Sequence, residues 1–65
     1  MTTDASMPTA PIGSFKQFAP GVPYEVVGPV RMAENGEWRV GITMIKTGEG
    51  AEIRLANVLE DPDAE

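Results

Sequence analysis

Carboxylates are the most numerous reactive side chains in this sequence, and several of them fall in pairs. The pairs are Glu34 and Glu37, Glu49 and Glu52, and Asp61 and Asp63. General acid catalysis needs a carboxyl group in an apolar pocket that raises its pKa, whereas two of these pairs flank predicted turns and the third lies in a terminal segment. The spacing also lacks the alternating acids and distal glutamate of a calcium-binding loop. We therefore expect these acids to be solvated.

The remaining reactive groups do not form a catalytic set. The chain contains no histidine and no cysteine, so its serine hydroxyls have no imidazole to activate them and zinc has neither of its usual nitrogen and sulfur ligands. Lys16 and Lys46 lie at the edges of predicted segments. The run Gly48-Glu49-Gly50 lacks the Lys-Ser or Lys-Thr that follows a phosphate-binding loop. The sequence predicts a protein that is not an enzyme and has no cofactor or metal site.

Glycine and proline divide the chain into short elements that would position any binding side chain. There are seven glycines and six prolines among 65 residues, which leaves no room for a long helix. Apolar side chains alternate with polar or small ones over residues 24–32, 37–46 and 51–55. This period of two is typical of a half-buried antiparallel sheet. We therefore predict a mainly β fold: a three-stranded antiparallel meander in the order 1-2-3, or an SH3-like open barrel.

The ends of the chain carry different patterns. Residues 1–11 have no periodic apolar pattern and are predicted to be a disordered tail, whereas residues 60–65 are predicted to be a frayed acidic tail. Residues 12–59 then form a single small β domain. A short helical turn is expected at residues 55–59, followed by Pro62. Residues 12–18 contain Phe15 and Phe18 at opposite strand parity, so this segment is either a fourth strand or a helical turn, and its rings should cover Trp38 and Tyr24.

The turns predict how the strands pair. A three-residue loop, Glu34-Asn35-Gly36, has a glycine suited to a left-handed bulge. The pairs that follow are Met32 with Trp38, Val30 with Val40, Gly28 with Ile42, and Val26 with Met44. A four-residue loop over residues 47–50 gives Lys46 with Ala51, Met44 with Ile53, and Ile42 with Leu55. Both registers keep the large apolar residues on one face, which a slip of one residue would move into solvent.

The opposite face of this sheet is the predicted docking surface. Its cross-strand rows are Glu25-Ile45-Glu52, Val27-Thr43-Arg54, Pro29-Gly41-Ala56 and Arg31-Arg39. Two arginines that face each other cost stability unless an acid or an anion lies between them. The face is either a solvated surface, with Glu37 or an acid of the tail beside the arginines, or a docking surface for a protein partner or a second copy of the chain. The candidate partner-binding residues are Arg31, Arg39, Arg54, Val27 and Ile45.

Trp38 has two interpretations as well. Its parity places it in the core, but on a shallow open sheet it could also form the floor of a groove for a proline-rich or nucleic-acid ligand. The five basic residues are spread along the chain, and this argues against nucleic acid.

Several segments together resemble a known family. The run Ile12-Gly13-Ser14-Phe15-Lys16-Gln17-Phe18, the run Pro23-Tyr24-Glu25-Val26-Val27-Gly28-Pro29, the run Gly36-Glu37-Trp38-Arg39-Val40 and the run Leu59-Glu60-Asp61-Pro62 are similar to those of a family of short proteobacterial proteins catalogued as a domain of unknown function. The resemblance implies no activity. It implies a bacterial cytosolic setting and a small stand-alone protein.

Charge and composition limit the function further. The formal net charge is −5, which disfavours binding to a phosphate backbone, and no apolar run approaches the roughly 20 residues that span a bilayer. We expect a cytoplasmic protein that binds neither membrane nor nucleic acid. The leading hypothesis is a small non-catalytic interaction or regulatory protein that docks to a protein partner, with a homodimer as a further option. The alternatives are an acidic inhibitor that mimics nucleic acid and the antitoxin of a toxin–antitoxin pair.

Overall fold

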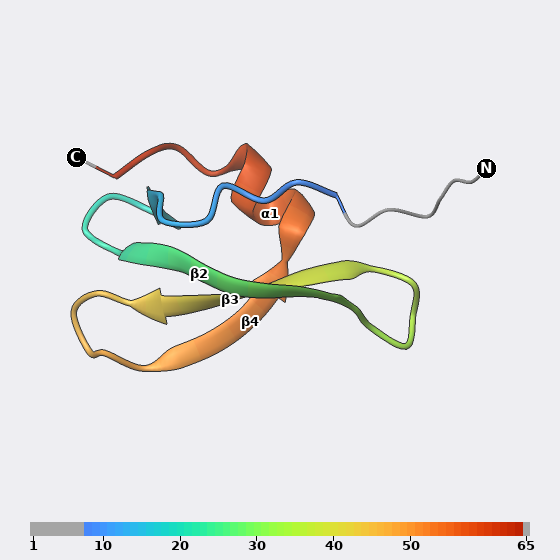
Figure 1. The fold of residues 1–65 in the computed structure, drawn as a ribbon. Helices are drawn as coiled ribbons and strands as arrows, with labels where there is room; N and C mark the ends of the chain where they lie inside the picture. Colours follow the sequence, from blue (N-terminus) through green and yellow to red (C-terminus); the bar gives the residue numbers. More distant parts are fainter. Residues whose placement is uncertain (1–7, 65) are drawn as a thin grey trace.

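A four-stranded antiparallel sheet carries one short helix on its apolar face (Figure 1). The computed structural model describes residues 8–64. Its elements are β1 (Phe15–Gln17), β2 (Pro23–Met32), β3 (Trp38–Met44), β4 (Gly50–Arg54) and α1 (Leu55–Glu60). The mainly β fold, the antiparallel sheet and the C-terminal helix are confirmed.

The sheet has one more strand than predicted. Residues 15–17 form a strand rather than a helical turn, and the strand order is β1-β2-β3-β4. The three-strand count is therefore wrong, because the short β1 pairs with β2 from Phe15 opposite Glu25 to Gln17 opposite Pro23. Among the described residues β1 and β4 lie at opposite edges and do not pair, so an SH3-like barrel is not confirmed.

The first hairpin has the predicted loop. Met32 pairs with Trp38 and Val30 with Val40, as expected. The Asn35 side-chain oxygen accepts a hydrogen bond from the backbone N–H of Glu37 at 3.1 Å, and Gly36 has a φ of +87°. This left-handed position favours glycine because a Cβ would be strained there.

The pairing of β2 with β3 shifts beyond Val30. The predicted pairs of Gly28 with Ile42 and Val26 with Met44 are wrong: Val26 lies opposite Ile42, and Tyr24 lies opposite Met44. The irregularity falls between Val26 and Val30, where Pro29 has no N–H to donate to the ladder. Since the register moves by an even number of residues, the same side chains still face the core.

The second hairpin turns earlier than predicted. Val40 lies opposite Ile53 and Ile42 opposite Ala51, so the predicted pairs that started from Lys46 and Ala51 are wrong. The backbone N–H of Met44 donates to the Glu49 carbonyl at 2.7 Å, and that of Gly48 donates to the Met44 carbonyl at 2.7 Å. Residues 45–48 therefore form the loop, with the left-handed position at Gly48.

The core lies between the sheet and α1. The residues that are fully or almost fully buried are Tyr24, Val26, Val40, Ile42, Leu55 and Val58. Val30, Met44 and Ile53 pack against this cluster, as the strand parity predicts. Trp38 also contacts it but is only partly buried.

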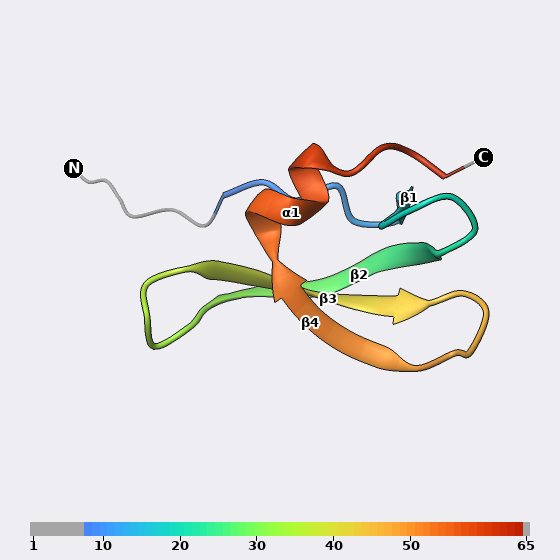
Figure 2. The same cartoon turned by 180° about the vertical axis from the view of Figure 1, so that it is seen from behind.

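Both ends of the described chain contact the domain. Ala10 packs against the core, so residues 8–11 are not a free tail; residues 1–7 of the predicted tail lie outside the described residues. Residues 61–64 run beside β1 (Figure 2), where Gln17 donates to the Pro62 carbonyl at 3.1 Å and Ala64 donates to the Phe15 carbonyl at 2.8 Å. The predicted frayed acidic end therefore differs from the structure, because backbone hydrogen bonds to an open sheet edge hold it.

No helix within residues 8–64 has the length and apolar character needed to cross a membrane.

Candidate docking site

The observed registers bring three arginines into one row across the sheet. Arg31 on β2 lies opposite Arg39 on β3, and Arg39 lies opposite Arg54 on β4. The first of these contacts is the predicted one. Arg54 was expected in a row with Val27 and Thr43, and the earlier turn of the second hairpin moves it beside Arg39 instead.

Two of the three guanidinium groups form ion pairs with acidic side chains. Arg31 donates from Nε and Nη2 to the two carboxylate oxygens of Glu52, both at 2.7 Å. The hydrogen bond from Arg31 is the main cause that lowers the pKa of Glu52 below its usual value. Arg54 donates to Glu37 at 3.2 Å and to the Asn57 side-chain oxygen at 3.3 Å. Glu37 was an expected neutralising acid, whereas Glu52 was not, since the predicted register placed it three rows away from Arg31 and Arg39.

Arg39, in the middle of the row, has no ion pair within residues 8–64. It is half-buried, and its charge helps to lower the pKa of Glu52. The row therefore combines three cations with two paired acids, which leaves little charge for an external anion.

The two apolar candidates do not join this row. Val27 and Ile45 are each 43% exposed, but Val27 lies in the irregular part of β2 and Ile45 lies in the loop of residues 45–48. The predicted row of Glu25, Ile45 and Glu52 is wrong: Glu25 lies opposite Thr43 instead. The predicted apolar candidates are therefore not part of the row that the three arginines form.

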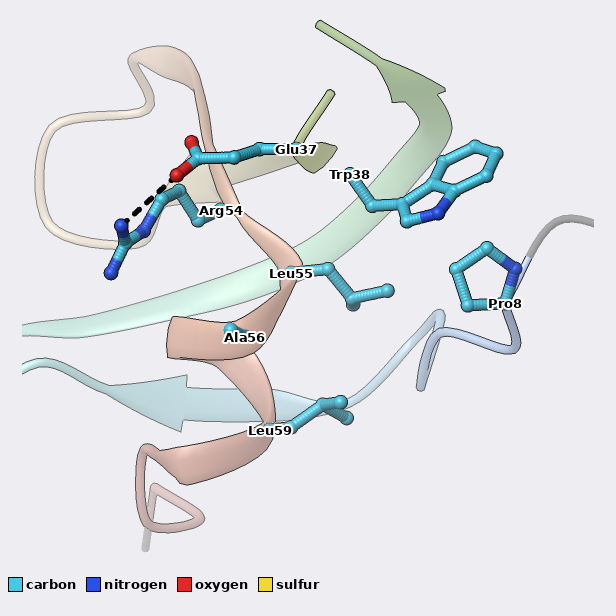
Figure 3. A pocket seen from close by; sticks show the side chains of 7 residues that line it. All are labelled: Pro8, Glu37, Trp38, Arg54, Leu55, Ala56 and Leu59. Atoms are coloured by element: carbon cyan, nitrogen blue, oxygen red, sulfur yellow. Dashed lines mark hydrogen bonds and ion pairs between the residues drawn. The ribbon is translucent and has the colours of Figure 1, made fainter. Parts of the chain in front are cut away.

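An apolar groove lies beside α1, where the helix meets the start of β3. It has a volume of about 390 Å³ and is lined by Pro8, Glu37, Trp38, Arg54, Leu55, Ala56 and Leu59 (Figure 3). Its walls come from β3, from α1 and from the N-terminal segment. The β2–β3 hairpin extends beyond α1 (Figure 1), so the core-facing side chains at its far end have no full cover. Met32, opposite Trp38, is accordingly 50% exposed.

Most of the groove surface is hydrocarbon. Leu59, in the last turn of α1, is 60% exposed although it lines the groove beside the buried Leu55. The two charged lining residues, Glu37 and Arg54, pair with each other at the end of the groove away from Pro8 (Figure 3). The groove can therefore hold an apolar side chain or peptide segment. Of the five predicted candidates, Arg54 alone lines it.

Sequence reasoning named Trp38 for such a groove and Arg54 for the opposite face, and it missed other lining residues. Trp38 was named as a possible groove floor. Leu59 and Ala56 were missed, although the spacing of Leu55, Ala56 and Leu59 places them on one side of a helix. Pro8 was missed because it reaches the groove from a segment without any periodic pattern. Within residues 8–64, no group of three or more acidic side chains is arranged to hold a metal ion.

Two comparisons with known proteins complete this description. A family model described as a family of unknown function, DUF5397, matches residues 3–65. The chain is also similar to a Haemophilus influenzae protein described as an uncharacterized protein, with 42% identity over 59 residues that cover 91% of this chain and 90% of the relative.

Proposed function

Because the chain belongs to the family of unknown function DUF5397, we propose its role from its own geometry: it is a small non-catalytic interaction protein that docks to a protein partner through the groove beside Trp38. The proposal keeps the cytoplasmic setting that the sequence resemblance implies.

The observation that carries this proposal is the incomplete burial of large apolar side chains around the groove. Trp38 and Leu59 line the groove, Leu59 is 60% exposed, and Met32, which pairs with Trp38, is 50% exposed. Aromatic side chains of this kind supply much of the binding energy at protein interfaces. A partner that covers them would complete a core which is small in the isolated chain.

The arginine row is the second candidate surface for the same function. Arg39 supports it, since this guanidinium has no ion pair within the described residues. Glu52 and Glu37 already form ion pairs with the two outer arginines. The row therefore offers an acidic partner less positive charge than three arginines alone would. The same ion pairs give little support to an acidic mimic of nucleic acid, because they engage two acids of the folded domain. An antitoxin role stays an alternative, and the identity of the captured partner would test it.

Affinity capture with the tagged full-length chain tests the proposal. The bait variants are Leu59→Gln in the groove, Arg39→Gln in the arginine row, and Ile45→Gln as an exposed control outside both surfaces. We expect one specific protein to be retained by wild type, Arg39→Gln and Ile45→Gln, and to be lost with Leu59→Gln. A partner that depends on Arg39 and not on Leu59 would overturn the groove proposal. Thermal melts of each bait show that the variants are folded.

A further inference from the structure

The chain places one of its own prolines in the groove. Pro8 begins the sequence Pro8-Thr9-Ala10-Pro11. Pro8 and Trp38 both line the groove, and in Figure 3 their rings lie toward the same end of it. This segment belongs to no strand. Its last two residues accept backbone hydrogen bonds: Ile12 donates to the Ala10 carbonyl and Ser14 donates to the Pro11 carbonyl. Ala10, two residues further along, packs against the core and keeps this segment close to the groove that Pro8 lines.

The chemistry of the groove suits a proline-containing segment. A proline ring is rigid and apolar, and it packs on the flat face of an aromatic side chain. An extended proline-containing chain also loses little conformational freedom on binding, because its backbone is already restricted. Trp38 provides the aromatic face, while Leu55, Ala56 and Leu59 provide aliphatic surface beside it.

The charges around the groove restrict the segment further. Glu37 and Arg54 pair with each other at 3.2 Å, so neither is left to bind a charge inside the groove. A charged residue inserted there would lose hydration without gaining a partner. The residues that enter the groove should therefore be uncharged.

Much of the groove stays open with Pro8 in place. Pro8 lies at one end, and Leu59 remains 60% exposed. From these observations we infer that the groove binds an extended, uncharged, proline-containing segment of the protein partner, and that Pro8 competes with this segment for the face of Trp38. This inference rests on the proposed function and names the chemistry of the partner.

Trp38 itself can report the binding, because it is the only tryptophan of the chain. The probe is a blocked peptide with the sequence of residues 7–13, and the control peptide has alanine in place of both prolines. Each is titrated into the full-length chain while tryptophan fluorescence is followed. We expect a saturable change with the proline peptide, and an affinity at least about tenfold lower with the alanine peptide, equivalent to roughly 1.4 kcal/mol.

Two protein variants separate the groove from the competing segment. Pro8→Ala in the full chain should bind the proline peptide more tightly than wild type, since it removes the competing ring, whereas Pro20→Ala, which changes a proline outside the groove, should bind like wild type. Leu59→Gln should weaken binding about tenfold, and Ile45→Gln should leave it unchanged. Equal binding of the two peptides, or no gain from Pro8→Ala, would overturn the inference.

The results also separate this inference from the proposed function. A captured partner that depends on Leu59, combined with a proline peptide that does not bind, would leave docking in place and reject the proline-containing occupant. A peptide that binds in the absence of any Leu59-dependent partner would support the groove chemistry and reject the docking function. Sedimentation that showed a dimer lost with Leu59→Gln would identify a second copy as the occupant and overturn the inference.

Discussion

Tyr24 connects the core to the C-terminal segment. Its side chain is fully buried, and its ring lies 4.6 Å from that of Phe18 between centroids, so the expected cover of Tyr24 by Phe18 is confirmed. Its hydroxyl donates to the Asp61 carboxylate at 2.6 Å. Burial raises the pKa of Tyr24 above its usual value, and the hydrogen bond and charge of Asp61 raise it further. A buried hydroxyl needs such a partner, since an unpaired one costs free energy.

Replacement of this hydroxyl should lower the stability of the fold. We expect Tyr24→Phe to reduce the free energy of unfolding by about 1.5–3 kcal/mol, because it removes a hydrogen bond to a charged acceptor but keeps the ring in place. Urea denaturation at pH 7 measures the change. Phe18→Leu is a control that alters the ring contact and leaves the hydroxyl bond intact. An unchanged urea midpoint for Tyr24→Phe would mean that the bond to Asp61 adds nothing to stability.

The Arg31–Glu52 pair should make stability depend on acidic pH. The pKa of Glu52 is lower in the folded chain than its usual value. Its contribution is therefore complete above the unfolded-state pKa and is lost as the pH falls through the folded-state value. We expect Glu52→Gln to flatten the fall of the melting temperature below about pH 4.5, while Glu34→Gln, on an exposed loop, should leave the slope as in wild type. Identical slopes for Glu52→Gln and wild type would contradict this assignment.

At the scale of the elements, the β2–β3 pair depends on one close backbone approach. A Cβ at Gly41 would lie 2.9 Å from the carbonyl carbon of Gly28 and would overlap its oxygen. Glycine at position 41 thus lets β3 pass the irregular part of β2. The same irregularity moves Val26 opposite Ile42 and Tyr24 opposite Met44, which fill the core.

Gly41→Ala should therefore be costly. We expect a loss of at least about 2 kcal/mol in the free energy of unfolding, because the backbone of β2 must move to admit the methyl group. Gly50→Ala is the matched control: the nearest atom to its added Cβ is the Ile42 carbonyl oxygen at 3.9 Å, so stability should stay the same or rise by up to about 1 kcal/mol. Similar thermal melts for the two variants would show that the close approach is not required.

The elements also show which parts of the fold the sequence could predict. The alternation of apolar and polar residues predicted the correct buried face for Val26, Val40 and Ile42. Both predicted registers were wrong by an even number of residues, and an even shift keeps each side chain on the same face. The registers themselves depend on which glycine takes the left-handed position of a turn, and Gly48 and Gly50 could not be ranked from local sequence. The pairing of residues 61–64 with β1 depends on backbone hydrogen bonds between distant segments, which have no side-chain pattern.

The candidate site was predicted less well than the fold, for a related reason. Trp38 was recognised because its side chain alone suggests two roles. The rest of the groove forms only when α1 and the N-terminal segment meet the start of β3. The residues next to Leu59 and Pro8 in the sequence show no pattern that predicts this contact. The opposition of Arg31 and Arg39 was predicted correctly because it depends on the first hairpin alone. The position of Arg54 depends on the second hairpin, whose register was wrong.

At the scale of the whole molecule, the core is small, so contacts made by the chain ends are a large part of its stability. A chain of 65 residues buries a modest share of its surface, and only six hydrophobic residues within the described part of it are buried. The C-terminal segment adds hydrogen bonds along β1. Lys16, whose side chain is 14% exposed, also pairs with Asp63 at 3.1 Å and donates to the Asp61 carbonyl. Residues 61–64 therefore cover one edge of the sheet, and β4 forms the opposite edge.

Truncation after Glu60 should destabilise the whole molecule for this reason. It removes the acceptor of the Tyr24 hydroxyl, the Pro62 carbonyl that Gln17 contacts, and the Ala64 N–H that binds the Phe15 carbonyl. At about 0.5–1.5 kcal/mol for each of the two neutral bonds and about 1.5–3 kcal/mol for the charged one, the expected loss is roughly 2.5–6 kcal/mol, a large part of the stability of so small a domain. Urea denaturation measures this loss, and hydrogen exchange should show that the Gln17 amide becomes unprotected while the Val40 amide stays protected. Pro62→Ala retains the backbone carbonyl and should behave like wild type. If the truncated chain kept the melting temperature and the Gln17 protection of the full chain, the acidic segment would be a frayed end after all, and β1 would be held by its pairing with β2 alone.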